Sequence, residues 1–125
     1  MSRQRLEPSV DIYHIWFNLK DGVRDIDFVD AARDYFEHLK SGERLAAYRI
    51  TRCKLGFTHS DLPEWHISLE FDGLAQLDQA FQHVSGRRDP VESFHHAVNS
   101  KVTDVKFALY RDFPDTWRDR GAERF

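Results

Sequence analysis

Polar and apolar residues alternate without a fault along residues 64–71, which is the pattern of a strand with one buried face. The apolar side of this strand comprises Trp65, Ile67, Leu69 and Phe71. A second alternating run spans residues 104–110. Its apolar side comprises Val105, Phe107 and Leu109. Both segments are predicted to be strands that bury one face against helices.

The segment at residues 10–19 predicts a strand that is apolar on both faces. One face of this strand carries Tyr13, Ile15, Phe17 and Leu19, and the opposite face carries Ile12, His14, Trp16 and Asn18. A domain of this size has enough helices to cover only one face of a sheet. The face that carries Trp16 therefore needs cover from a partner subunit or a ligand.

Three segments have the 3.6-residue period of amphipathic helices. They are residues 25–40, residues 74–84 and a short segment that begins at Asp89 and Pro90. Asp25 or Asp27 can cap the first helix. Residues 45–55 are less clearly patterned and rich in arginine, which favours an edge strand, because charged side chains discourage unwanted pairing.

The predicted order is β-α-β-β-α-(α)-β, a ferredoxin-like α+β fold with an extra short helix before the last strand. In that topology the first strand is central in an antiparallel sheet, beside the third and fourth strands. We expect one domain at residues 10–111, with an N-terminal extension at residues 1–9 and a polar tail at residues 112–125. No internal repeat divides the chain.

The face of the sheet away from the helices would mix aromatic and ionisable side chains. Its residues are Ile12, His14, Trp16, Asn18, His66, Ser68, Glu70, Lys106 and Tyr110. This set is too aromatic for a plain solvent surface and too polar for a dry core. A homodimer that packs two such faces together around a partly polar cavity satisfies both constraints, and it would form a dimeric α/β barrel.

Composition excludes several classes of function. The net charge of −3 argues against a nucleic-acid partner, whose binding surface is normally basic. No apolar run is long enough to span a membrane, and the first residues lack the apolar segment of a secretory signal. Cys53 is the single cysteine, so the chain has no internal disulfide. We therefore expect a cytoplasmic protein with no membrane partner and no cofactor.

Two segments resemble the stress-responsive A/B barrel (Dabb) family. The first, Tyr-His-Ile-Trp-Phe-Asn-Leu-Lys-Asp-Gly-Val at residues 13–23, is similar to the family's opening strand and turn. The second, Trp-His-Ile-Ser-Leu-Glu-Phe-Asp-Gly-Leu at residues 65–74, is similar to its third strand and the start of its second helix. The resemblance implies a dimeric α/β barrel with a ligand-sized cavity, in a family most of whose members have no assigned reaction.

Plant polyketide cyclases of that family use a histidine after the second helix, with a tyrosine on that helix and a histidine on the first strand. His14 matches the first-strand histidine and His83 matches the histidine after the helix. Ala80 or Phe81 stands where the family has its tyrosine, and the segment after His83 differs. The resemblance thus carries over two positions of the cyclase site and not the third.

His14 and His66 are the candidate catalytic residues, because both would lie on the open face, where a neutral imidazole can act as a base. The alternatives are a hydrogen-bonded histidine pair at a dimer interface, or two ligands of a metal ion, for which no third ligand is identifiable. The candidate ligand-binding residues share the same face: Trp16, Asn18, Ser68, Glu70, Lys106 and Tyr110. No metal site is predicted.

Residues elsewhere in the chain suggest a further class. Haem-degrading enzymes and antibiotic-biosynthesis monooxygenases of this superfamily place an asparagine on the first strand and a histidine beyond the second helix. Asn18 and either His95 or His96 can fill these two roles, and one of the two histidines is expected at the mouth of the cavity. The tryptophan that such enzymes carry on the second helix is absent here.

The function predicted from the sequence is that of a homodimer that binds a small molecule between helices and sheet. One alternative is a cofactor-independent lyase, cyclase or monooxygenase with a histidine base. A second alternative is a structural dimer with no ligand, in which His14 and His66 pair across the interface and no cavity exceeds a few waters.

Overall fold

The computed structural model describes residues 9–114, which form one antiparallel sheet and three helices. The elements in chain order are β1 (Asp11–Leu19), α1 (Asp25–Ser41), β2 (Ala47–Arg52), β3 (Trp65–Phe71), α2 (Leu74–Ser85), α3 (Val91–Asn99) and β4 (Val102–Arg111). Most of the predicted extension and most of the predicted tail lie outside the described residues. Within residues 9–114, no helix is long and apolar enough to cross a membrane.

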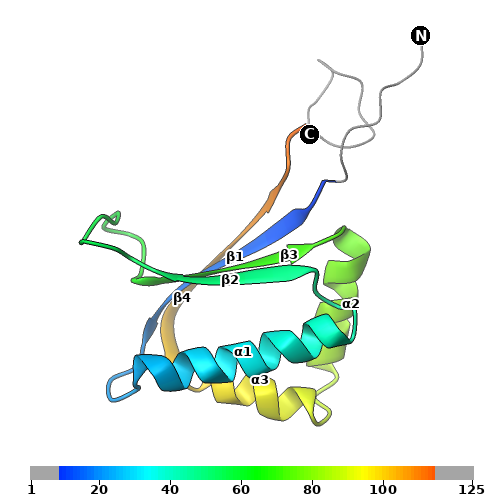
Figure 1. Cartoon of the computed structure of the whole chain (residues 1–125), viewed down its shortest axis with the longest axis horizontal. Coiled ribbons are helices and arrows are strands. Elements are labelled where there is room, and N and C mark those ends of the chain that lie inside the picture. The colour runs from blue at the N-terminus through cyan, green and yellow to red at the C-terminus, as the bar shows by residue number, and fades with distance from the viewer. Residues whose placement is uncertain (1–8, 115–125) are drawn as a thin grey trace.

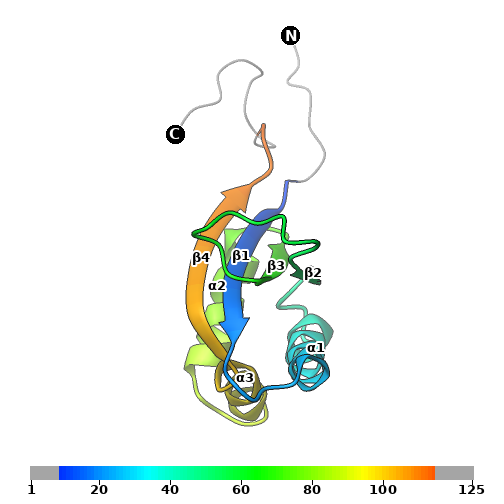
Figure 2. The same ribbon diagram turned by 90° about the vertical axis from the view of Figure 1, so that its left-hand side faces the viewer.

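The sheet has the order β2-β3-β1-β4, so β1 is central between β3 and β4, and β2 is an edge strand. Figure 2 shows β1 and β4 side by side along their length. The central position of β1 and the edge position of β2 confirm the prediction from the sequence, and the predicted α+β class is confirmed as well. In the β1–β3 pairing Ile15 lies opposite Ile67 and Phe17 opposite Trp65, so the apolar sides of the two strands share one face.

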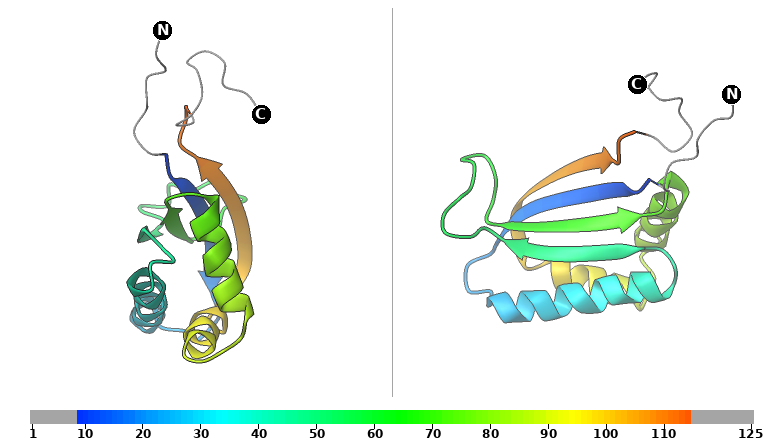
Figure 3. Two further views of the ribbon diagram at one scale, coloured as in Figure 1. Left: turned by 90° about the vertical axis from the view of Figure 1, so that its right-hand side faces the viewer. Right: turned by 45° about the horizontal axis from the view of Figure 1, so that its top comes forward.

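The three helices lie on this apolar face of the sheet. Figures 1 and 3 show α1 and α3 next to each other beneath the strands, with α2 at one end. Phe28, Ala32 and Phe36 of α1 are almost completely buried, and they form a core with Phe17 and Ile67 of the sheet. The period of α1 thus buries one stripe of the helix and leaves its charged side in solvent.

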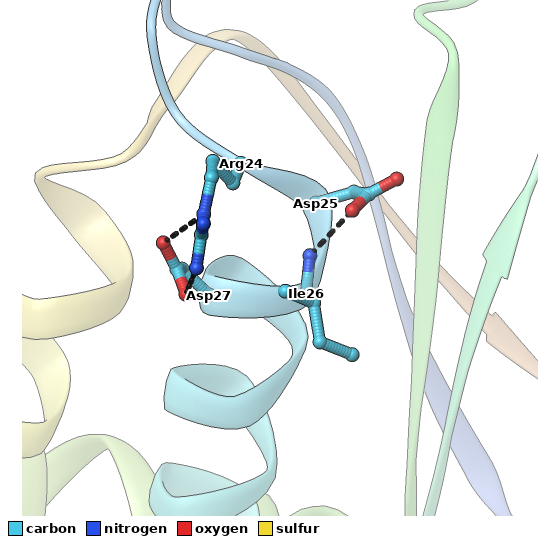
Figure 4. A network of polar contacts seen from close by, with 4 residues as sticks. All are labelled: Arg24, Asp25, Ile26 and Asp27. Atoms are coloured by element: carbon cyan, nitrogen blue, oxygen red, sulfur yellow. Dashed lines mark hydrogen bonds and ion pairs between the residues drawn. The ribbon is translucent and has the colours of Figure 1, made fainter.

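The first turn of α1 differs from the prediction that an aspartate caps it. Arg24 occupies the N-cap position, and both aspartates lie inside the helix. The guanidinium of Arg24 donates hydrogen bonds of 3.0 and 3.2 Å to Asp27, and the amide of Ile26 donates to Asp25 Oδ1 at 2.7 Å (Figure 4). Two carboxylates in the first turn are favourable, because they face the positive end of the helix dipole.

The helix layer leaves one apolar row of β4 uncovered. Val105, Phe107 and Leu109 are on the helix side of the sheet, as predicted, but their exposed fractions are 36%, 59% and 51%. The helices therefore do not cover this part of β4, the edge strand beside β1. One wall of the space between helices and sheet is therefore open.

Candidate functional site

The pairing of β1 with β3 brings His14 and His66 together on the face away from the helices. His14 lies opposite Ser68 and Trp16 opposite His66, as predicted for registers that centre on each other. The diagonal contact joins His14 Nδ1 to His66 Nε2 at 2.9 Å. This distance is a hydrogen bond in which one imidazole donates and the other, a neutral ring, accepts.

Aromatic and polar neighbours hold this histidine pair. The ring of Trp16 is centred 5.0 Å from His66 and 5.6 Å from His14, and Tyr110 meets His14 edge-on at 5.0 Å. Thr51 Oγ1 lies 3.3 Å from the remaining ring nitrogen of His66. Burial lowers the pKa of both histidines, and for His66 the charge of His14 lowers its pKa further. Both rings therefore favour the neutral form near pH 7.

The other predicted binding residues lie on the same face, in different roles. The side chain of Asn18 is already engaged: it accepts from the amide of Glu64 at 2.9 Å and donates to Asp104 at 3.2 Å. Lys106 is the cross-strand neighbour of Trp16 in the β1–β4 pairing. Ser68 and Glu70 follow His66 at alternate positions of β3. Asn18 thus helps to tie strand ends together, whereas Ser68 lies opposite His14, and Glu70 and Lys106 lie opposite Ile12 and Trp16 on the same face.

A pocket of about 430 Å³ adjoins this face beside the loop between β2 and β3. Trp16 and His66 form one side, and Cys53 and the loop form the other. Figure 1 shows this loop extending beyond the end of the sheet, and Leu55 and Phe57 on it are 81% and 85% exposed. His66 of the histidine pair therefore borders a small open pocket.

A larger cavity of about 840 Å³ lies on the opposite side of the sheet, between the strands and the helices. Strands β1, β3 and β4 and all three helices contribute to it. Its apolar walls include Ile15, Phe17, Leu69, Phe71, Ala80 and Phe107. The volume is within the range of pockets that hold small organic ligands. A cavity between helices and sheet was predicted, but none of the eight predicted site residues lines it.

One end of this cavity is polar. Glu92, His95 and Asn99 of α3 are spaced by three and four residues, so they share one side of the helix, and all three line the cavity. Tyr35 of α1 faces them, with its ring edge-on to His95 at 5.8 Å between centroids. Burial and the negative charge of Glu92 raise the pKa of Tyr35 to about 12.

The polar groups at this end lack protein partners. Among residues 9–114, the side chains of Tyr35, Glu92 and His95 form no hydrogen bond or ion pair, and neither does that of Tyr13, which lines the cavity from β1. His14 and His66 on the other face satisfy each other. Partly buried polar groups normally find a partner, so these four are available to a molecule inside the cavity.

The roles of Tyr35 and Glu92 at the cavity were not predicted from the sequence. The spacing of Glu92 and His95 was the available signal, but such spacing is common on solvated helices. Both His95 and His96 border the cavity; His95 is half-buried and His96 exposed. On β1 the residue that lines the cavity is Tyr13, whereas His14 points to the opposite face.

The remaining sequence candidates are not brought together into one site. His83 pairs with His38 of α1, Nε2 to Nε2 at 3.1 Å, while Ala80 lines the cavity. Asn18 belongs to the opposite face of the sheet from His95, so the two do not form one site. Within the described part of the chain, no group of three histidine, cysteine or carboxylate side chains could hold a metal ion.

Several solved structures share this fold at low sequence identity. The hydroxynitrile lyase of Passiflora edulis matches with a TM-score of 0.64 and 12% identity, over 86% of this chain and 97% of that one. A mutant of SnoaB, a cofactor-independent oxygenase from Streptomyces nogalater, matches with a TM-score of 0.61 and 8% identity, over 87% and 100% of the two chains. A dimeric ferredoxin-like protein of unknown function from Jannaschia sp. CCS1 matches with a TM-score of 0.60 and 10% identity, over 81% of this chain and 97% of that one.

These likenesses show the ferredoxin-like fold that the resemblance to the Dabb family implied, and they do not show membership of that family. Among curated proteins, none matches this sequence. The model of one sequence family covers residues 10–125, nearly the whole chain. This protein therefore belongs to the family of unknown function DUF6614.

Proposed function

We propose that this protein binds a small, mostly apolar molecule in the cavity between the helices and the sheet. The observation that carries the proposal is the cavity itself: about 840 Å³ with apolar walls and unpartnered polar side chains at one end. A concave, mostly apolar space of this size with a few polar groups is typical of pockets that bind small organic molecules. The structural alternative, which expects no such cavity, is disfavoured.

The proposed binding protein is a homodimer that packs through the open faces of two sheets. Trp16, His14 and Tyr110 give each face an aromatic patch, and Tyr110 is 60% exposed in the single chain. Neighbours of the same fold are described as dimeric. The histidine pair forms within one chain, so it would enter the interface already hydrogen-bonded, with Ser68, Glu70 and Lys106 on the same face. A cytoplasmic location remains a prediction from the sequence.

A second candidate function is cofactor-independent proton transfer with His14 or His66 as the base. The lowered pKa values of both histidines support it, because a neutral imidazole can accept a proton near pH 7. The pocket beside Trp16 and His66 would hold the substrate, with Asn18, Ser68 or Tyr110 as orienting groups. The lyase and the oxygenase of the same fold support it only by analogy. Unchanged ligand affinity and turnover in His66→Ala would eliminate this site.

Native mass spectrometry of gently purified protein tests the assembly and the binding together. The expected result is a species at twice the 14.8 kDa of the chain, with a reproducible extra mass from a bound molecule. Ala80→Leu, which fills part of the cavity, should lose that extra mass and remain dimeric. A bare monomer would contradict the dimer, and an extra mass that survives cavity filling would place the ligand elsewhere.

A matched pair of variants tests the interface. Tyr110→Glu places a charge on the open face, and Ile26→Glu places one on α1, at positions that are 60% and 56% exposed. We expect Tyr110→Glu to shift the protein to monomer on size-exclusion chromatography, because a buried unpaired charge is costly. Ile26→Glu should elute as the wild-type protein does. Equal elution of both variants would show that the open face is not the interface.

A further inference from the structure

We infer that Tyr35 recognises the ligand of the cavity by donating a hydrogen bond to a neutral acceptor oxygen, such as the ketone of a flat aromatic molecule. This inference rests on the proposed function, and it adds the chemical class of the ligand and the residue that selects it.

The position of Tyr35 leaves its phenol free for this role. The residue is in the middle of α1, half-buried, with its ring stacked on Phe36 at 5.2 Å and edge-on to His95 at 5.8 Å. These contacts hold the ring at the cavity wall. Within residues 9–114 its hydroxyl has no hydrogen-bond partner, although the ring is fixed. A fixed, unpartnered donor at a cavity wall is suited to orient a ligand.

The charge around Tyr35 sets the kind of group it would bind. Burial and Glu92 keep the phenol protonated at neutral pH, so it presents an O–H donor there. Glu92 lines the same end of the cavity, and among the described residues no cation forms an ion pair with it. Arg87 also lines the cavity, but its side chain is exposed to solvent. A carboxylate placed beside Tyr35 would be repelled by Glu92, whereas a ketone oxygen would not. A neutral acceptor therefore fits this end best.

The walls of the cavity favour a flat aromatic body for the same molecule. Tyr13 stacks on Phe107 with 5.5 Å between centroids and 6° between the ring planes, and Phe81 meets Tyr13 edge-on at 5.5 Å. Phe107 is 59% exposed, so this aromatic wall is at the open side of the cavity over β4. A bicyclic aromatic ligand can enter there and stack on the wall, with its oxygen directed toward Tyr35.

The test compares three probes that share one aromatic body: 2-acetonaphthone, 2-isopropenylnaphthalene, in which a methylene group replaces the ketone oxygen, and 2-naphthoate. Equilibrium dialysis measures the affinity of each for the wild-type protein, Tyr35→Phe and Tyr13→Phe. In the wild type we expect the ketone to bind roughly five-fold tighter than the alkene, the effect of one net hydrogen bond. The carboxylate should bind more weakly than the ketone.

Tyr35→Phe keeps the ring and removes only the hydroxyl, so the ketone and the alkene should then bind equally. Tyr13→Phe removes the other unpartnered phenol and should retain the preference for the ketone. The inference is overturned if the two probes bind equally to the wild type, if the preference survives Tyr35→Phe, if Tyr13→Phe abolishes it, or if the carboxylate binds best. Equal binding of ketone and alkene would leave the proposed function standing. Failure of all three probes to bind would overturn the inference, whereas the extra mass in native mass spectrometry decides the proposed function separately.

Discussion

Replacement of Ala80 by leucine tests whether the space between the helices and the sheet is open. Ala80 lies on α2, is 6% exposed and lines the cavity. Leucine adds three carbon atoms, and each buried methylene contributes about 0.8 kcal/mol. Loss of side-chain freedom takes back about 0.5–1 kcal/mol. The difference in helix propensity between the two residues is small. We expect Ala80→Leu to raise the free energy of unfolding by about 1–2 kcal/mol if the cavity accepts the added atoms.

The matched control is Ala32 on α1. It is 0% exposed, belongs to the hydrophobic core and does not itself line the cavity. Ala32→Leu therefore forces extra volume into a packed region, which typically costs about 1–3 kcal/mol. The two substitutions are chemically identical and both occur on helices. The structure predicts opposite signs for their effects on stability.

Urea unfolding followed by far-ultraviolet circular dichroism measures both effects at one protein concentration, because dimerisation makes the midpoint depend on concentration. With a slope of about 1.5 kcal/mol per molar urea, a change of 1.5 kcal/mol moves the midpoint by about 1 M. Equal destabilisation by the two substitutions would refute the reasoning, since it would show that Ala80 is packed as tightly as Ala32.

Three further predictions concern single contacts. Asp11→Asn should lower the free energy of unfolding by about 1–3 kcal/mol in the urea assay, because the buried carboxylate of Asp11 accepts a 2.6 Å hydrogen bond from Arg111 Nε; an unchanged midpoint would contradict this. Burial holds the pKa values of His14 and His66 below 6.5, so the unfolded chain binds protons more tightly and stability falls as the pH drops below about 6.5. The difference in midpoint between about pH 7.5 and pH 5.5 should shrink in the His14→Gln/His66→Gln variant. Leu55 has φ of 56° and is 81% exposed, so Leu55→Asn should raise stability by about 1 kcal/mol, and a decrease would refute that expectation.

The order of elements and the sheet topology could be predicted from the sequence because periodicity is a local property. Alternation along residues 64–71 indicates a strand with one buried face. The apolar residues on both sides of β1 indicate a central strand. The observed order β2-β3-β1-β4 agrees with both. Predicting that His14 and His66 lie close together required one assumption, namely that the two strands pair about their centres. The observed register agrees with this assumption.

The residues that line the cavity could not be predicted in the same way. The alternation of β1 places Tyr13 on the helix side of the sheet and His14 on the open side, as observed. The pattern does not show that the helix side encloses a cavity, so Tyr13 reads as an ordinary core residue. Tyr35 belongs to a helix whose pattern marks it as an ordinary member of the apolar stripe. Nothing in that pattern shows that its hydroxyl lacks a partner.

The sequence by itself determined which segments are helices and strands, and that one face of the sheet is apolar while the other mixes aromatic and ionisable groups. These features follow from the two side-chain periods of 2.0 and 3.6 residues. The tertiary structure alone decided that the helices leave β4 partly uncovered, and that Tyr35, Glu92 and His95 meet at one end of a cavity. The reason is physical: a cavity depends on the distances and rotations between packed elements, and no local pattern of residues specifies them.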